Sequence, residues 1–138
     1  LDCLVGSEMC IRDRRQARKE TMEKGIDAPI VMNSLRKAGE FLDQLEANIE
    51  DSGWIAGDKF SMADACTLPY IQRLDHLALS EAFREEKRPK INKWYKKVKD
   101  LDFFDKAVTS QIPPPLVEMM NTFGEEVKDR ALTLMEEN

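Results

Sequence analysis

The chain has 138 residues, 42% of them hydrophobic and 34% charged, which is the size and composition of one folded domain. Its formal net charge of −5 argues against nucleic acid or an anionic membrane surface as a partner. No apolar run approaches the roughly 20 residues that a bilayer-spanning helix needs, so no membrane partner is expected.

The cysteines and the histidine show no pattern of a metal site. Cys3, Cys10 and Cys66 are an odd number of thiols without the paired spacing of zinc ligands, and His76 is the single histidine. We therefore expect no metal site and no Ser-His-Asp triad. Unpaired thiols are typical of a reducing compartment, which predicts a cytoplasmic protein. Because Cys66 falls in an apolar segment, we expect a buried small hydrophobic residue there and not a reactive thiol.

Residues 1–14 differ from the rest of the chain. Their sequence, LDCLVGSEMCIRDR, has neither the basic start of a signal peptide nor a helical or strand-like period. It resembles the translation of sequencing-adaptor read-through, so we predict a non-native segment at 1–14 and the native domain at 15–138. A genuine N-terminal arm is the alternative. If the segment is foreign, the natural protein continues upstream into sequence that this chain does not contain.

Two helices are expected in the first third of the domain. Residues 14–24 are polar and rich in helix formers, and Gly25 supplies a helix stop. Asp27 then stands where an N-cap belongs, with Pro29 in the first turn of a helix over about residues 28–51. Its apolar residues recur at alternating steps of three and four, which is typical of a bundle helix. The stripe comprises Val31, Leu35, Ala38, Leu42, Leu45 and Ile49, and Phe41 widens it.

The segment WIAGDKF, residues 54–60, predicts a loop that leads into a capped helix. Ser61 and Asp64 have the spacing of a capping box, in which each side chain binds the backbone N–H of the other residue. Phe60 takes the position of a hydrophobic staple, with only the small Ala65 opposite it. We therefore expect Phe60, Ser61 and Asp64 to form a structural cap and not a catalytic pair. Replacement of Asp64 by Ala is expected to cost about 1–2 kcal/mol, as other cap losses do.

The helix that starts at Ser61 is expected to end near residue 79. Apolar residues lie on nearly all of its sides, and a helix of that kind is buried in its domain. These residues are Ala63, Ala65, Cys66, Leu68, Tyr70, Ile71, Leu74, Leu77 and Ala78. The segment is therefore predicted to be the buried central helix.

Three more helical segments follow. Pro89 opens a helix to about residue 100, whose inner face has the spacing i, i+3, i+4 and i+7. A short helical piece is expected over 103–109, and a last helix over about 116–136. The inner face of the helix that Pro89 opens comprises Ile91, Trp94, Tyr95 and Val98. The inner face of the helix over about 116–136 comprises Leu116, Met120, Phe123, Val127, Ala131 and Leu134. Since no segment alternates with a period of two, the predicted fold class is an all-α helical bundle.

Two blocks of the sequence resemble the C-terminal helical domain of the cytosolic glutathione transferases. The first matches that family's Trp-aliphatic-x-Gly-Asp loop and its Ser/Thr-x-Ala-Asp helix start. Its matching positions are Trp54, Ile55, Gly57, Asp58, Phe60, Ser61, Ala63 and Asp64. The second block comprises Arg88, Pro89, Trp94 and an aromatic residue at Phe103 or Phe104. The resemblance covers residues 15 to about 110.

This resemblance implies a division of labour. In the family, a thioredoxin-like domain binds glutathione and supplies the catalytic Tyr, Ser or Cys. The helical domain forms the wall of the hydrophobic substrate site and part of the dimer surface. The resemblance thus implies glutathione as a cosubstrate of the parent protein, and the thioredoxin-like domain and a second copy in a homodimer as partners. We expect the chain alone to bind no cofactor and to be inactive.

The sequence leaves two alternative functions open and does not identify the substrate-binding residues. The same fold also serves as a non-catalytic protein-interaction module, and a stand-alone bundle with a closed polar surface is a third possibility. Candidates for a hydrophobic substrate pocket are Met119, Met120 and Phe123, with core packing as the alternative. Candidates for a polar contact near the glutathione cleft are Arg14, Arg15 and Arg18.

Overall fold

The computed structural model describes the backbone of residues 2–137 and the side chains of residues 13–137. Within this range all regular structure is helical and no strand occurs, which confirms the predicted fold class. The α-helices are α1 (Asp2–Lys24), α2 (Pro29–Asn48), α3 (Met62–His76), α4 (Pro89–Lys99), α5 (Phe104–Ala107) and α6 (Pro114–Glu136). The 3₁₀ turns are η1 (Gly25–Asp27), η2 (Ser80–Phe83) and η3 (Thr109–Gln111). None of the helices in the described range has the length and apolar character that crossing a bilayer requires.

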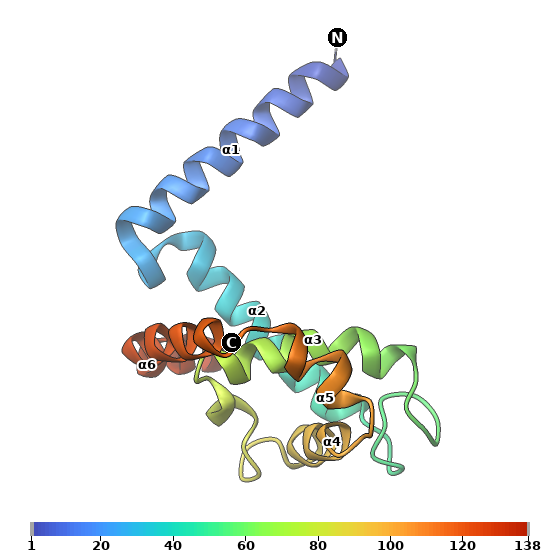
Figure 1. Cartoon of the computed structure of the whole chain (residues 1–138). Helices are drawn as coiled ribbons and strands as arrows, with labels where there is room; N and C mark the ends of the chain where they lie inside the picture. Colours follow the sequence, from blue (N-terminus) through green and yellow to red (C-terminus); the bar gives the residue numbers. More distant parts are fainter. Residues whose placement is uncertain (1, 138) are drawn as a thin grey trace.

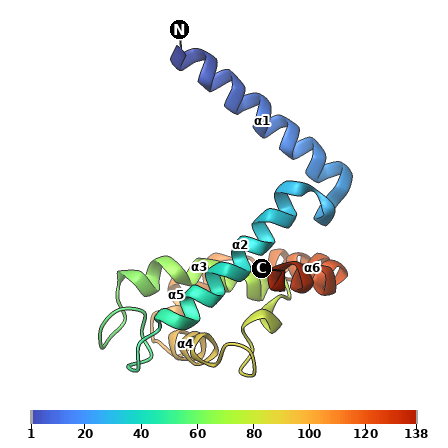
Figure 2. The ribbon, with the colours of Figure 1, turned by 180° about the vertical axis from the view of Figure 1, so that it is seen from behind.

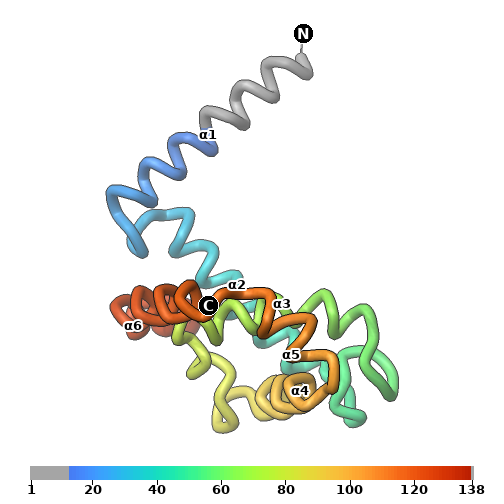
Figure 3. The backbone as a smooth tube through the Cα atoms, in the orientation of Figure 1, coloured from blue at the N-terminus to red at the C-terminus, as the bar shows by residue number. Residues whose placement is uncertain are grey.

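The two views of the ribbon show that α1 turns sharply into α2 and leads away from the other helices (Figures 1 and 2), and the tube drawing traces the same path from residue 13 onward (Figure 3). Gly25 makes the turn with a φ of +57°, in the left-handed region that favours glycine. The N-cap of α2 is Ala28, so the prediction that Asp27 caps this helix is wrong. Pro29 takes the first helical position, and Asp27 is the last residue of the preceding 3₁₀ turn, one residue too early to be the cap. The origin of the first fourteen residues stays a prediction.

The core lies between α2, α3 and α4. Leu42 and Ile49 of the α2 stripe are buried against the same cluster as Ile71 of α3. The predicted inner face of α4 is confirmed, because all of its members are buried. They are Ile91, Trp94, Tyr95 and Val98. The apolar stripes of α2 and α4 thus pack together in the centre of the domain.

α3 is buried on one side only. Leu68 and Ile71 face the core, whereas Met62 is 77% exposed, Tyr70 is 66% exposed, and Cys66 is exposed as well. The predictions of all-round burial and of a buried Cys66 are therefore wrong. Apolar residues on every side make burial favourable, but they do not supply a neighbouring helix to cover each side.

Phe41 of α2 lies beside this exposed side instead of in the α2 stripe. Its ring centre is 5.8 Å from that of Tyr70, and the residue is 36% exposed. We refer to Phe41, Met62, Cys66 and Tyr70 together as the α3 face.

α6 packs against the rest of the molecule mainly through its C-terminal half. Ala131, Leu134 and Met135 are buried, whereas Leu116 is 41% exposed and Phe123 is 60% exposed. The predicted inner face of this helix is therefore buried only toward its end.

Two glycines allow helices to approach closely. A Cβ atom on Gly39 of α2 would collide with the backbone carbonyl of Met135 in α6. A Cβ atom on Gly124 of α6 would collide with the carbonyl of Leu77, the residue after α3. These contacts set how near α6 lies to α2 and to the end of α3.

The start of α4 is capped by a side chain from α2. The carboxylate of Glu46 accepts hydrogen bonds from the backbone N–H groups of Lys90 and Ile91, at 2.9 Å each. These groups are in the first turn of α4, where no intrahelical acceptor exists. A distant carboxylate thus replaces the local cap that Arg88 cannot provide.

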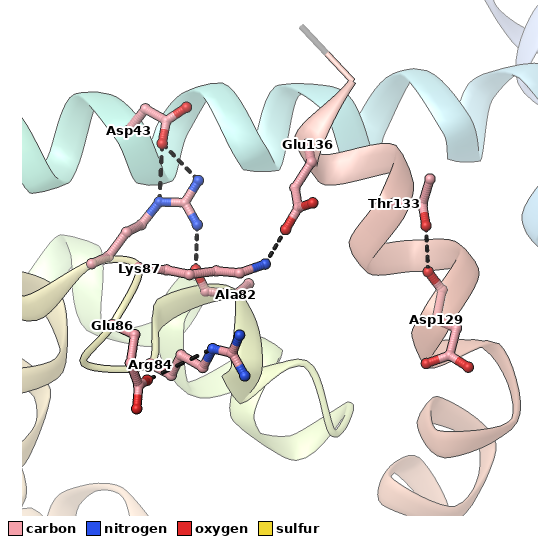
Figure 4. A network of polar contacts seen from close by, with 9 residues as sticks. Asp43, Ala82, Arg84, Glu86, Lys87, Asp129, Thr133 and Glu136 are labelled. Atoms are coloured by element: carbon pink, nitrogen blue, oxygen red, sulfur yellow. Dashed lines mark hydrogen bonds and ion pairs between the residues drawn. The ribbon is translucent and has the colours of Figure 1, made fainter.

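Ion pairs connect the loop before α4 to α2 and α6. The guanidinium of Arg88 donates to Asp43 Oδ1 at 2.6 and 3.0 Å and also to the carbonyl of Ala82. Figure 4 shows Asp43 and Ala82 in this network, with a second pair, Lys87 and Glu136, that joins the loop before α4 to α6. The Arg88 pair is the better shielded of the two, since that side chain is only 12% exposed.

We expect Gly39→Ala to destabilise the protein, although alanine is the better helix former. The gain in helix propensity is about 1 kcal/mol, but the new methyl group must displace backbone of α6, and overpacking of this kind costs roughly 1–3 kcal/mol. Urea unfolding should give a lower midpoint for Gly39→Ala. The exposed neighbour Lys37→Ala serves as control and should stay within about 0.5 kcal/mol. An unchanged or raised midpoint for Gly39→Ala would show that α6 does not approach α2 this closely.

Candidate functional site

The carboxylate of Asp64 joins three segments of the chain. Asp64 has no exposed surface. Its Oδ2 accepts hydrogen bonds from the Ser61 backbone N–H at 2.9 Å and the Ser61 hydroxyl at 2.7 Å. Its Oδ1 accepts from the Ile55 N–H at 3.1 Å and from the Trp94 indole N–H at 2.8 Å. The loop before α3, the first turn of α3 and the middle of α4 therefore meet at one side chain.

These donors keep the carboxylate ionised. Burial by itself raises the pKa of Asp64, but the hydrogen bonds from Ser61, Trp94 and Ile55 outweigh it and lower the pKa below its ordinary value of 3.8. Because both oxygens are occupied by protein donors and shielded from water, the group has no free lone pair directed at a substrate. The arrangement suits a structural role.

The loop residues of the family-like motif surround this cluster. Trp54 is buried, its ring meets the Phe60 ring edge-on at 5.8 Å, and the ammonium of Lys97 lies 3.9 Å from its centre. Gly57 adopts a φ of +76°, and Asp58 is exposed. The loop is therefore held by its aromatic residues at the core side, with its turn residues in solvent.

Phe60 packs against aromatic rings from other segments. Besides Trp54, its ring contacts Phe103 at 5.2 Å between centres. Sequence patterns gave no sign of this partner, nor of Trp94 as a donor to Asp64, since neither is a neighbour along the chain.

A second candidate site is an apolar pocket of about 320 Å³ beside α6. It is bounded by the end of α1, the following turn, α2, the end of α3 and the second half of α6. Its lining residues are Thr21, Gly25, Ile26, Val31, Leu35, Leu77, Leu79, Phe123, Gly124, Val127 and Ala131. Among these described residues Thr21 is the single polar side chain, and its hydroxyl donates to the carbonyl of Ala17 at 2.8 Å. We call this hollow the apolar pocket.

The sequence candidates for substrate contact divide around this pocket. Phe123 lines it, whereas Met119 and Met120 do not. Arg14 and Arg18 line a neighbouring hollow of about 570 Å³ that shares Thr21 with the apolar pocket, and Arg15 lines neither. The structure therefore places basic side chains next to an apolar cavity.

The apolar pocket can bind but has no group for acid–base or nucleophilic chemistry. None of its lining residues titrates near neutral pH. Within the described residues, no group of three His, Cys, Asp or Glu side chains is arranged to hold a metal ion. The chemistry that this site supports by itself is the exclusion of water around an apolar molecule.

We expect Asp64→Asn to cost roughly 3 kcal/mol of stability, more than the loss of a helix cap alone, because it leaves donors from three segments without a charged acceptor. The lowered native pKa means that the carboxylate stabilises the fold above about pH 4 and loses this effect as pH falls through the native pKa. Urea unfolding at pH 7 should show the full difference between wild type and Asp64→Asn, and the difference should shrink below about pH 4. The exposed Asp58→Asn is the matched control. A difference of under about 0.5 kcal/mol at pH 7 would contradict the role of Asp64 as the junction.

Comparison with known proteins gives one family. The model of the glutathione S-transferase C-terminal domain matches residues 4–102, a range that contains the loop, the start of α3 and all of α4. No curated protein and no solved structure matches the chain. Since the matched range is well over half of the chain and the fold is all-helical, the chain belongs to the glutathione S-transferase C-terminal domain family.

Proposed function

We propose that the chain is the helical part of a glutathione-dependent transferase and that its apolar pocket holds the hydrophobic electrophile. The lining of that pocket carries the proposal. A volume of about 320 Å³ accommodates a small molecule. Since a charged ligand group would lose its hydration there without gaining a partner, the lining favours an uncharged, apolar substrate.

The reacting thiolate is proposed to come from a separate domain. Transfer from glutathione requires a thiol that is deprotonated at neutral pH, which a nearby hydrogen-bond donor or positive charge achieves. No residue that lines the apolar pocket can act in that way. We infer that a thioredoxin-like domain binds glutathione and activates it, while Arg14 and Arg18 border the side from which an anionic tripeptide would enter.

The α3 face supports an association with another domain or subunit. Met62 and Tyr70 are the most exposed large apolar residues of α3, and Phe41 extends the surface onto α2. Adjacent exposed apolar side chains of this kind mark interaction surfaces. The proposed occupants are the thioredoxin-like domain or a second copy in a homodimer. The exposed thiol of Cys66 agrees with a reducing, cytoplasmic environment.

The same surface favours a second candidate function, that of a non-catalytic protein-interaction module. Such a module needs the α3 face but has no use for the apolar pocket. Binding of a small apolar molecule therefore separates the two functions.

We expect the neutral aromatic probe nitrobenzene to bind in the apolar pocket. Titration of the ¹⁵N-labelled chain should give saturable shifts at Leu35, Leu77 and Val127. Phe123→Ala should weaken binding by about 3–10-fold, because the lost contact between the probe and the ring is worth about 1 kcal/mol of binding free energy. Leu116→Ala removes a similarly exposed apolar side chain of α6 outside the pocket and should leave the affinity unchanged. Shifts confined to the α3 face would favour the interaction module.

We expect the chain alone to show no transferase activity. With glutathione and 1-chloro-2,4-dinitrobenzene, the absorbance of the conjugate should rise at the rate found in buffer, because nothing in the apolar pocket activates the thiol. An active glutathione transferase at the same concentration is the positive control. A protein-dependent rate would contradict the division of labour, even if nitrobenzene binds as expected.

A further inference from the structure

A larger hollow lies at the other end of α6 and belongs to none of the sites described so far. It has a volume of about 680 Å³ and is bounded by the end of α3, by α4, by α5 and the turn after it, and by the first two turns of α6. It borders α6 at residues 114–121, whereas the apolar pocket borders it at 123–131. We call it the acidic pocket, for the carboxylates described next.

A carboxylate held by a buried phenol lies on one wall. The hydroxyl of Tyr95 donates to Asp75 Oδ2 at 2.9 Å, and Tyr95 is only 5% exposed. Burial first, and then the charge of Asp75 and this hydrogen bond, raise the pKa of Tyr95. The phenol therefore keeps its proton at neutral pH and directs it at Asp75, which fixes the orientation of the carboxylate.

Asp75 has no cationic partner among the residues that the structure describes. Two basic side chains line the pocket, Lys99 and His76. The ammonium of Lys99 lies over the ring of Tyr95, 4.4 Å from the ring centre. Nε2 of His76 lies 3.5 Å from the side-chain amide nitrogen of Gln72. Glu118 adds a second carboxylate from α6, and it too is in no ion pair within the described part of the chain. Two carboxylates thus face one pocket in which the single lysine is engaged with an aromatic ring.

The remaining wall is apolar. Its lining includes the buried Phe104 and the half-buried Ile112 and Val117. Apolar atoms make up most of the surface of the hollow. This surface suits the hydrocarbon part of a ligand, while the carboxylates suit a positive group at one end.

We propose that the acidic pocket binds a small organic amine, with its ammonium group at Asp75 and Glu118 and its apolar body against Phe104 and Val117. The oxygen of Asp75 that Tyr95 does not occupy accepts a charge-assisted hydrogen bond from the ammonium. A carboxylate ligand is disfavoured because it would face two like charges. The proposal is independent of the transferase function, since it uses none of the residues of the apolar pocket.

A matched series of probes tests the charge requirement on the wild-type chain. The probes are 2-phenylethylamine, 2-phenylethanol and phenylacetate, which share an aromatic body and differ in the polar end. Titration of the ¹⁵N-labelled chain should give saturable shifts at Gln72, Tyr95 and Val117 with the amine, weaker binding by at least tenfold with the alcohol, and none with the acid. Equal affinities for amine and alcohol, or no saturable shifts, would overturn the proposal.

Two variants test the assignment to Asp75. Asp75→Asn keeps an acceptor for the Tyr95 hydroxyl but removes the charge, and it should weaken amine binding about tenfold. Glu118→Gln, on an exposed side chain, should weaken it by a smaller factor. The exposed Asp102→Asn is the control and should bind as wild type does. Unchanged amine affinity in both pocket variants would refute the site, and if Asp75→Asn fails to unfold cooperatively, Glu118→Gln and the probe series still decide the question.

Discussion

The fold depends on the burial of one fully hydrogen-bonded carboxylate. Asp64 accepts from Ser61, from Ile55 and from Trp94, so it fixes the loop, the start of α3 and the middle of α4 relative to one another. An ionised group without solvent contact is costly unless donors surround it. The segments must therefore come together in a single arrangement, and the aromatic packing of Trp54 then fills the space around it.

Sequence patterns predicted the helices well and their burial less well. The inner face of α4 was right in all four residues, because one narrow stripe leaves a single way to bury the helix. α3 has apolar residues on every side, so its pattern contains no information on which side meets a neighbour. The exposure of Tyr70 and Cys66 could therefore not be predicted from the pattern. The place of Phe41 could not be predicted from the α2 stripe either, because the ring beside it, Tyr70, belongs to another helix.

The candidate site was predictable only where its parts are close in sequence. The spacing of Ser61 and Asp64 indicated a helix start, and the motif around them indicated the family. The donor Trp94 lies 30 residues away from Asp64, and no local pattern points to it. The roles of the glycines could not be predicted from the sequence either, because helix propensity alone marks a glycine inside a helix as destabilising. The backbone contact that requires Gly39 becomes visible when α6 is placed beside α2.

The two halves of α6 are buried to different degrees. Its C-terminal half is held by buried residues such as Leu134 and by the close approach at Gly39, where steric fit leaves little freedom. The ion pair of Arg36 with Glu137, the residue after α6, is about 40% exposed at both side chains and contributes little. The first half of α6 has exposed side chains and borders the acidic pocket on the α4 side, whereas its second half borders the apolar pocket on the α1 side. The wall of the apolar pocket is thus built on the part of α6 that the core holds in place, with Gly124 and Ala131 both buried, while Phe123 and Val127 keep exposed surface. The residues that border the acidic pocket lie on the less buried half, where a substitution disturbs fewer core contacts.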